Sequence, residues 1–218
     1  MSVLNSLQNY IPTGNILHVH KFQKNISEPH AARKGDIEKS NKKLQRILGK
    51  WQAGKIYLKV ITPIRNPISR NISAFFHYEG VEIVNVFKKF DAINELLNMF
   101  LASRHTKKSY ENWFNGEIFE NFRVDVFSVP FPDAGVARFS SRNFDLLIYR
   151  LELSDSVKEA AIKTYLNLDK FELEPHNIGE QKFYAEAYRV FKKFAKLPDS
   201  YVNSIHGGKY YRHFYNVE

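Results

Sequence analysis

The chain has 218 residues, 44% hydrophobic and 25% charged, which is enough to bury a core in a single domain (1–218) and argues against disorder. The absence of cysteine excludes disulfides and thiolate chemistry, and without an 18-residue apolar run or a signal peptide we expect a soluble, cytoplasmic protein. The formal charge of +9 indicates an anionic partner; scattered basic pairs argue against nucleic acid, although 15% aromatic content keeps that partner open.

Strand-like and helix-like segments alternate along the chain. Apolar runs predict strands at 15–20, 55–62 and 144–151. Helical spacing and capping residues predict helices at 36–48, 67–78, 90–104, 110–122, 154–167, 181–194 and 198–205. The helix at 67–78 is expected to end at the Glu79–Gly80 pair. This alternation predicts an α/β fold with a mainly parallel sheet flanked by many helices.

The segment between the strand at 55–62 and the helix at 67–78 is the most informative part of the sequence. Asn66 is a good N-cap, and Pro67 suits the first helical position. A helix start of this kind offers free backbone N–H groups and the positive end of the helix dipole. Side-chain donors are added by Arg65, Ser69, Arg70 and Ser73. We expect a phosphate site here; the alternative is an ordinary strand-to-helix junction with solvated arginines.

Arg65 and Ser73 stand eight positions apart in the pattern R-N-P-x-x-x-x-x-S. This resembles the segment with which sulfotransferases bind the 3′-phosphate of PAPS (3′-phosphoadenosine-5′-phosphosulfate). The longer string from Arg65 to Phe76 is similar to a bacterial branch, the capsular polysaccharide synthesis proteins. Further matches lie in the same order at 18–20, 113–118, 124–126, 146–152 and 209–215. The resemblance implies a P-loop-like three-layer sandwich that transfers sulfate from PAPS to a carbohydrate hydroxyl.

The amino-terminal residues depart from the sulfotransferase pattern. Sulfotransferases open with a strand and a Lys/Gly/Ser-rich loop that holds the 5′-phosphosulfate and helps to stabilise charge during transfer. Here residues 1–7 read as part of the helix that follows such a loop, so the loop itself is expected to be missing. The sequence leaves open whether this reflects truncation or loss, and whether the chain is active.

Two histidines are the best candidates for catalysis. His18 and His20 are two positions apart on a predicted strand, so both side chains would lie on the same face. Sulfate transfer to a hydroxyl needs a base, and a neutral imidazole suits this role. By this resemblance, His20 occupies the position of the catalytic base in cytosolic sulfotransferases, and His18 occupies the position of a lysine close to that base. The alternative is that they are structural or weakly metal-binding; without a third ligand we expect no metal site.

Four further residues are candidates for contacts with ligands. Trp113 and Glu117 lie four positions apart on the helix predicted at 110–122 and could bind the acceptor, or form an ordinary helix surface. Lys209 and Arg212 lie in a tail that resembles the segment near the nucleotide in sulfotransferases. They could contact phosphate, or the aromatic residues around them could simply pack.

Three functional hypotheses follow from the sequence. The first is a sulfotransferase-like enzyme that binds an anionic nucleotide donor and a carbohydrate acceptor. The second is a non-catalytic accessory or binding protein of polysaccharide synthesis that keeps the 3′-phosphate site. The third is a basic nucleic-acid-binding protein. The sequence does not determine the acceptor or the oligomeric state.

Overall fold

The computed structural model describes residues 3–12, 16–17, 34–89, 92–104, 112–174 and 182–215. The chain divides into two compact units. The helical unit comprises Met1–Ser2, Arg65–Ser109 and Pro175–Glu218, and the sheet unit comprises Val3–Ile64 and Tyr110–Glu174. Residues 65–73, which the sequence predicts to bind phosphate, therefore belong to the helical unit.

The sheet unit contains three strands in the order β1-β3-β2. Strand β1 (Leu58–Ile64) runs parallel to β3 (Phe144–Arg150), with Leu58 opposite Phe144. Strand β2 (Val136–Ser141) is antiparallel to β3, to which it is joined by a two-residue turn. The prediction of strands near 55–62 and 144–151 is thus confirmed, whereas β2 was not predicted. The strand predicted at 15–20 lies largely outside the described residues.

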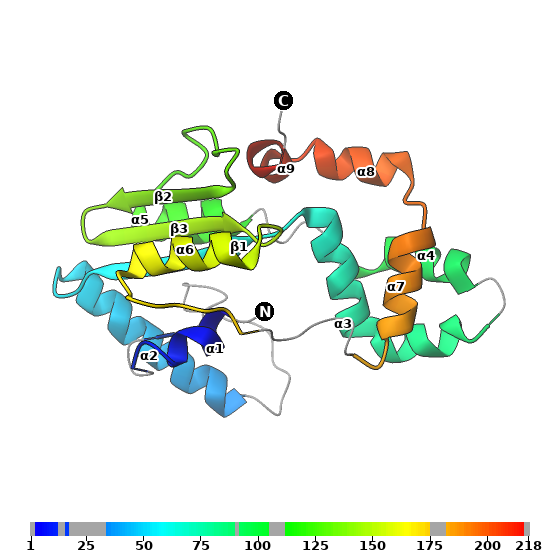
Figure 1. Cartoon of the computed structure of the whole chain (residues 1–218), viewed down its shortest axis with the longest axis horizontal. Coiled ribbons are helices and arrows are strands. Elements are labelled where there is room, and N and C mark those ends of the chain that lie inside the picture. Colours follow the sequence, from blue (N-terminus) through cyan, green and yellow to red (C-terminus); the bar gives the residue numbers. More distant parts are fainter. Residues whose placement is uncertain are drawn as a thin grey trace. The chain divides into compact units, whose positions relative to one another are not determined.

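Helices cover both faces of this sheet. Helix α6 (Asp155–Leu166) covers one face (Figure 1). Its Ile162 and Tyr165 pack on Leu147 and Tyr149 of β3. Helix α1 (Val3–Gln8) adds Leu7 to the same cluster. On the opposite face, α5 (Glu120–Phe122) and the end of α2 (Lys34–Gln52) supply aromatic rings. Phe122 stacks on Phe144 at 4.0 Å between ring centroids, and Trp51 meets Phe122 edge-on.

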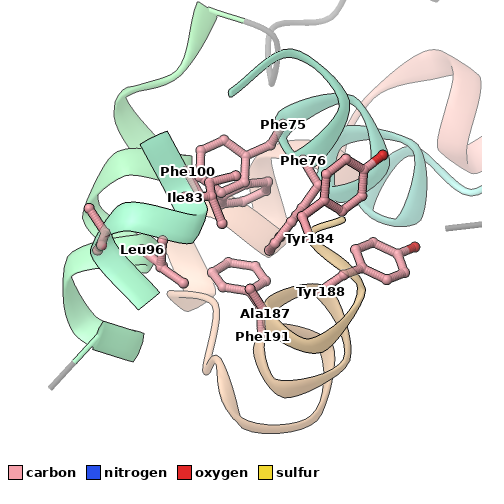
Figure 2. Close-up of a cluster of buried hydrophobic side chains, with 10 residues drawn as sticks. Phe75, Phe76, Ile83, Leu96, Phe100, Tyr184, Ala187, Tyr188 and Phe191 are labelled. Carbon is pink, nitrogen blue, oxygen red and sulfur yellow. The ribbon is translucent and has the colours of Figure 1, made fainter. Parts of the chain in front are cut away.

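The helical unit has its own aromatic core. It is built by α3 (Pro67–Phe87), α4 (Ala92–Ala102) and α7 (Ala185–Phe194), shown in Figure 2. Phe75 of α3 meets Phe100 of α4 edge-on at 5.6 Å, and Phe76 meets Tyr188 of α7 at 5.2 Å. Helices α8 (Asp199–His206) and α9 (Lys209–Phe214) complete the unit. The core of the helical unit is thus formed by helices, and none of the described strands belongs to this unit.

Helix α3 does not end at Gly80, as the sequence predicted, but continues to Phe87. A Cβ atom at Gly80 would lie 2.6 Å from Cδ1 of Tyr184 and 3.1 Å from Cζ of Phe183. Gly80 is therefore needed for the close approach of two aromatic rings to the helix. In this position the absence of a side chain serves packing and does not break the helix.

The expected P-loop-like sandwich with a mainly parallel sheet is wrong. The described sheet has three strands and is mixed, because the short turn between β2 and β3 permits only antiparallel pairing. The segments after β1 and after residue 174 form helices around a separate aromatic core instead of adding strands. The protein is a mixed α/β protein in which helices predominate.

Candidate functional site

The start of α3 is capped by Asn66. Its Oδ1 accepts hydrogen bonds from the backbone N–H groups of Ile68 and Ser69, at 3.0 and 3.3 Å. Pro67 has no N–H group, and the N–H of Arg70 donates to the Asn66 carbonyl at 2.8 Å. The sequence correctly predicted the cap and the proline, but the first N–H groups already have acceptors within the chain. An anion at this helix start would therefore depend on side chains and on the helix dipole.

The predicted phosphate-binding side chains gather at this helix start. Ser69 and Ser73 are four positions apart on α3, which places them along one side of the helix. Arg65 lies two residues before the first residue of α3, and all three side chains are half-buried. Within the described ranges, no ion pair involves Arg65. A half-buried guanidinium that has no carboxylate partner there favours an anionic ligand.

Arg70 is held by a hydrogen-bonded chain that the sequence analysis missed. Its Nη1 donates to Oδ1 of Asn71 at 3.1 Å, and Nδ2 of Asn71 donates to the Tyr201 hydroxyl of α8 at 2.9 Å. Burial raises the pKa of the Tyr201 hydroxyl, while Asn71 and the charge of Arg70 act in the opposite direction. Asn71 is fully buried between the apolar positions Ile68 and Phe75. A polar residue inside an apolar stripe was the available signal for such a bond.

Helix α9 lies against the backbone that precedes α3. The hydroxyl of the buried Tyr210 donates to the carbonyl oxygen of Arg65 at 3.5 Å, the long limit for a hydrogen bond. Lys209 and Arg212 of α9 are exposed and belong to the same unit as Arg65. The two cations Lys209 and Arg212 thus lie on the same helix as Tyr210, the residue that contacts Arg65.

Trp113 and Glu117 belong to the sheet unit, whereas the residues at the start of α3 belong to the helical unit. They belong to the π-helix η4 (Trp113–Phe119), where the N–H of Glu120 donates to the carbonyl of Asn115. The sequence predicted an ordinary α-helix here, and the structure has a π-helix instead. Such turns are short and rare in proteins, and those that occur are often found at functional sites. Trp113 is half-buried, whereas Glu117 is only 8% exposed. His18 and His20 lie outside the described residues.

A second polar cluster that the sequence analysis did not predict surrounds Asp145 of β3. This carboxylate is fully buried, and it accepts a 3.1 Å hydrogen bond from Nε of Arg138 and a further one from the Ser140 hydroxyl. Burial alone would raise the pKa of Asp145, but these bonds and the charges of Arg138 and Lys59 leave the pKa below its ordinary value. An aspartate inside the apolar run 144–149 was the signal for an internal partner.

The described residues contain no group of three or more His, Cys, Asp or Glu side chains placed to hold a metal ion. No helix in the described ranges is both long and apolar enough to span a bilayer.

The fold and the helix start define a helix-rich α/β protein with a cluster of cationic and hydroxyl side chains at the beginning of α3. A family model described as "Putative capsular polysaccharide synthesis protein" matches residues 68–216, which is more than half of the chain and runs from α3 to the end of α9. The chain therefore belongs to this capsular polysaccharide synthesis family. No curated protein and no solved structure matches it.

Proposed function

We propose that the protein is a sulfotransferase-like enzyme of capsular polysaccharide synthesis that uses PAPS to sulfate a carbohydrate hydroxyl. The observation that carries this proposal is the placement of Arg65 just before a 21-residue helix and of Ser69 and Ser73 on one side of its first two turns, near the positive end of its dipole. The 3′-phosphate of PAPS would bind there, with Arg70, Lys209 and Arg212 adding positive charge. Arginine suits this ligand because its planar group donates two parallel hydrogen bonds to phosphate oxygens.

The proposed reaction is an in-line displacement at sulfur. The acceptor oxygen attacks the sulfur atom, the bond from sulfur to the phosphate oxygen breaks, and 3′-phosphoadenosine 5′-phosphate leaves. The proton of the acceptor hydroxyl passes to His20 as general base, with His18 on the same predicted strand face. Trp113 would contact the acceptor sugar, and Glu117 would accept hydrogen bonds from its hydroxyl groups through the small area that it exposes.

An accessory protein that binds a nucleotide or glycan without catalysis is the second candidate. It is favoured by the three-stranded mixed sheet, because the described residues do not form the parallel sheet expected of a P-loop-like enzyme. Such a protein would keep the Arg65 site but would not transfer sulfate. The two candidates therefore agree on nucleotide binding and differ in turnover.

Calorimetry with two nucleotides tests the phosphate site. 3′-Phosphoadenosine 5′-phosphate should bind more tightly than adenosine 5′-phosphate, since only the first carries a 3′-phosphate. Arg65→Ala should weaken binding of the first nucleotide by about 1.5–3 kcal/mol, the range for a hydrogen bond to a charged group, and should remove the difference between them. Arg104→Ala, an exposed arginine after α4, is the matched control and should change neither affinity. Equal affinities in the unmodified protein would rule out the site.

Transfer of radiolabelled sulfate from PAPS to sugar acceptors separates the two candidates. In an enzyme, His20→Gln should lower turnover by about 10²- to 10⁴-fold with unchanged nucleotide affinity, the usual cost of losing a general base. Nucleotide binding without any transfer would favour the accessory protein. Full turnover in His20→Gln would remove His20 from the mechanism.

A further inference from the structure

Helix α7 carries a row of exposed cations that the proposed nucleotide site does not use. Arg189, Lys192 and Lys193 are spaced at i, i+3 and i+4, so they share one side of the helix, and Lys196 lies two residues beyond its end. All four side chains are exposed. We call these four residues, together with the exposed Phe194, the α7 basic stripe.

The charges of the α7 basic stripe are not neutralised within the described part of the chain. The ion pairs found there involve none of its four cations. Lys192 instead lies 5.2 Å from the ring centroid of Tyr188, and Lys193 lies 5.1 Å from that of Phe194. Between residues 187 and 198 the sequence has no acidic residue. The stripe is therefore a local positive patch that presents four cations to a ligand.

The opposite side of α7 is occupied by the core. Ala187, Tyr188 and Phe191 point toward α3 and α4, and Phe191 lies 5.5 Å from Phe76 between ring centroids (Figure 2). This packing holds the helix with its cations outward. It also argues against an interfacial membrane helix, because such a helix needs its apolar side to enter the lipid.

Phe194 adds an apolar contact to this patch. Its side chain is 56% exposed at the end of α7, next to Lys193. A large exposed aromatic ring beside cations is costly to hydrate and suits a ligand with alternating flat apolar faces and negative charges. A sugar ring has an apolar C–H face, and an acidic sugar also carries a carboxylate or sulfate.

We propose that the α7 basic stripe is a docking surface for an anionic polysaccharide chain. The cations would pair with carboxylate or sulfate groups, while Phe194 would stack against a sugar ring. Charge complementarity and membership of a polysaccharide synthesis family favour this partner over nucleic acid. The inference goes beyond the proposed sulfotransferase activity and does not require a nucleotide at α3.

Two pairs of adjacent lysines in the helical unit allow a charge-matched test. Lys192→Gln/Lys193→Gln removes two cations of the stripe, and Lys88→Gln/Lys89→Gln removes two exposed cations at the end of α3, where Lys89 pairs with Glu95 at 3.3 Å. Binding to dextran sulfate should weaken about three- to tenfold in the first variant and less than twofold in the second. Phe194→Ser should also weaken it, and neutral dextran should not bind. Circular dichroism would verify that all variants are folded.

Three results would overturn the proposal. Equal weakening by both lysine pairs would mean that dextran sulfate responds to total charge and not to the stripe. Tighter binding of single-stranded oligonucleotides through Lys192 and Lys193 at physiological salt would make the surface a nucleic-acid site. Binding to anionic vesicles that requires Phe194 would make it a membrane contact. Affinity for 3′-phosphoadenosine 5′-phosphate should stay unchanged in every stripe variant, which separates this proposal from that of the nucleotide site.

Discussion

Two buried tyrosines of the sheet unit differ in the partners of their hydroxyl groups. The Tyr165 hydroxyl accepts from the N–H of Val60 at 3.0 Å and lies 2.8 Å from the carbonyl of Asp145. The Tyr149 hydroxyl is buried and finds no hydrogen-bond partner among the described residues. Burial raises the pKa of both hydroxyls well above the ordinary value, so both stay neutral at physiological pH. The same chemical group therefore has opposite energetic roles on one face of the sheet.

Replacing each tyrosine by phenylalanine should show this difference. Tyr149→Phe removes an unsatisfied buried hydroxyl and should leave the free energy of unfolding unchanged or raise it by about 1 kcal/mol. Tyr165→Phe leaves backbone groups without a partner and should lower it by about 1–3 kcal/mol. Chemical denaturation of the two variants measures both changes. Equal losses of stability would contradict the assignment.

The buried carboxylate of Asp145 makes stability depend on pH. Because its pKa is lower in the folded than in the unfolded protein, the ionised group contributes stability above about pH 4, the ordinary aspartate pKa. That contribution is lost as the pH falls through the folded-state pKa. Arg138→Met removes the main opposing charge, so burial would raise the pKa of Asp145 and acid unfolding should begin at higher pH.

An acid titration followed by circular dichroism measures this shift. Arg46→Met is the control, because it removes an exposed arginine of α2 away from the Asp145 cluster. Its acid midpoint should match that of the unmodified protein. A midpoint that is also unchanged in Arg138→Met would show that Asp145 does not depend on this arginine.

At the scale of whole elements, two helical glycines have opposite surroundings. A Cβ atom at Gly80 of α3 would collide with the buried Tyr184, whereas a Cβ atom at Gly49 of α2 would meet nothing within 4 Å. Gly49→Ala should raise the free energy of unfolding by up to about 1 kcal/mol, the helix-propensity gain of alanine. Gly80→Ala should lower it by about 1–3 kcal/mol through overpacking. Thermal unfolding of both variants measures these changes. A stability of Gly80→Ala above that of the unmodified protein would contradict the prediction.

At the scale of the whole molecule, most of the excess positive charge of the described residues lies in one unit. The described residues of the helical unit contain 12 basic and 5 acidic side chains, against 15 and 13 in the sheet unit. Most of this excess therefore lies in the unit that holds both the α3 residues and the α7 basic stripe. A compact anion site and an acidic glycan would each account for it.

This distribution leads to a prediction for nucleic acid. Random single-stranded or duplex oligonucleotides should bind with a Kd weaker than about 1 μM at physiological salt, and the affinity should fall steeply as salt rises. Fluorescence anisotropy over a salt series measures both quantities. Tight, sequence-selective binding at physiological salt would instead support a nucleic-acid-binding function.

Local chemistry was readable from the sequence because it acts over a few residues. Asn66 and Pro67 determine the start of α3, and the apolar run at 144–150 forms β3 as predicted. The alignment of Ser69 and Ser73 on one side of α3 also follows from their spacing along the helix. These features need only neighbouring residues. The motifs that indicated the polysaccharide synthesis family span most of the chain, but they too are read from the order of residues alone.

Contacts between distant residues decided the rest. The Arg142–Asn143 turn lacks the Asn-Gly signal of hairpins, so β2 became evident only from its pairing with β3. Gly80 reads as a helix break until Tyr184, more than 100 positions later, packs against it. Which side chains are buried, and which groups they contact, depends on which segments pack together in the folded protein. Short stretches of sequence do not specify these tertiary contacts. The sequence therefore determined the start of α3 and the family, whereas the tertiary structure decided the mixed sheet and the separate aromatic core.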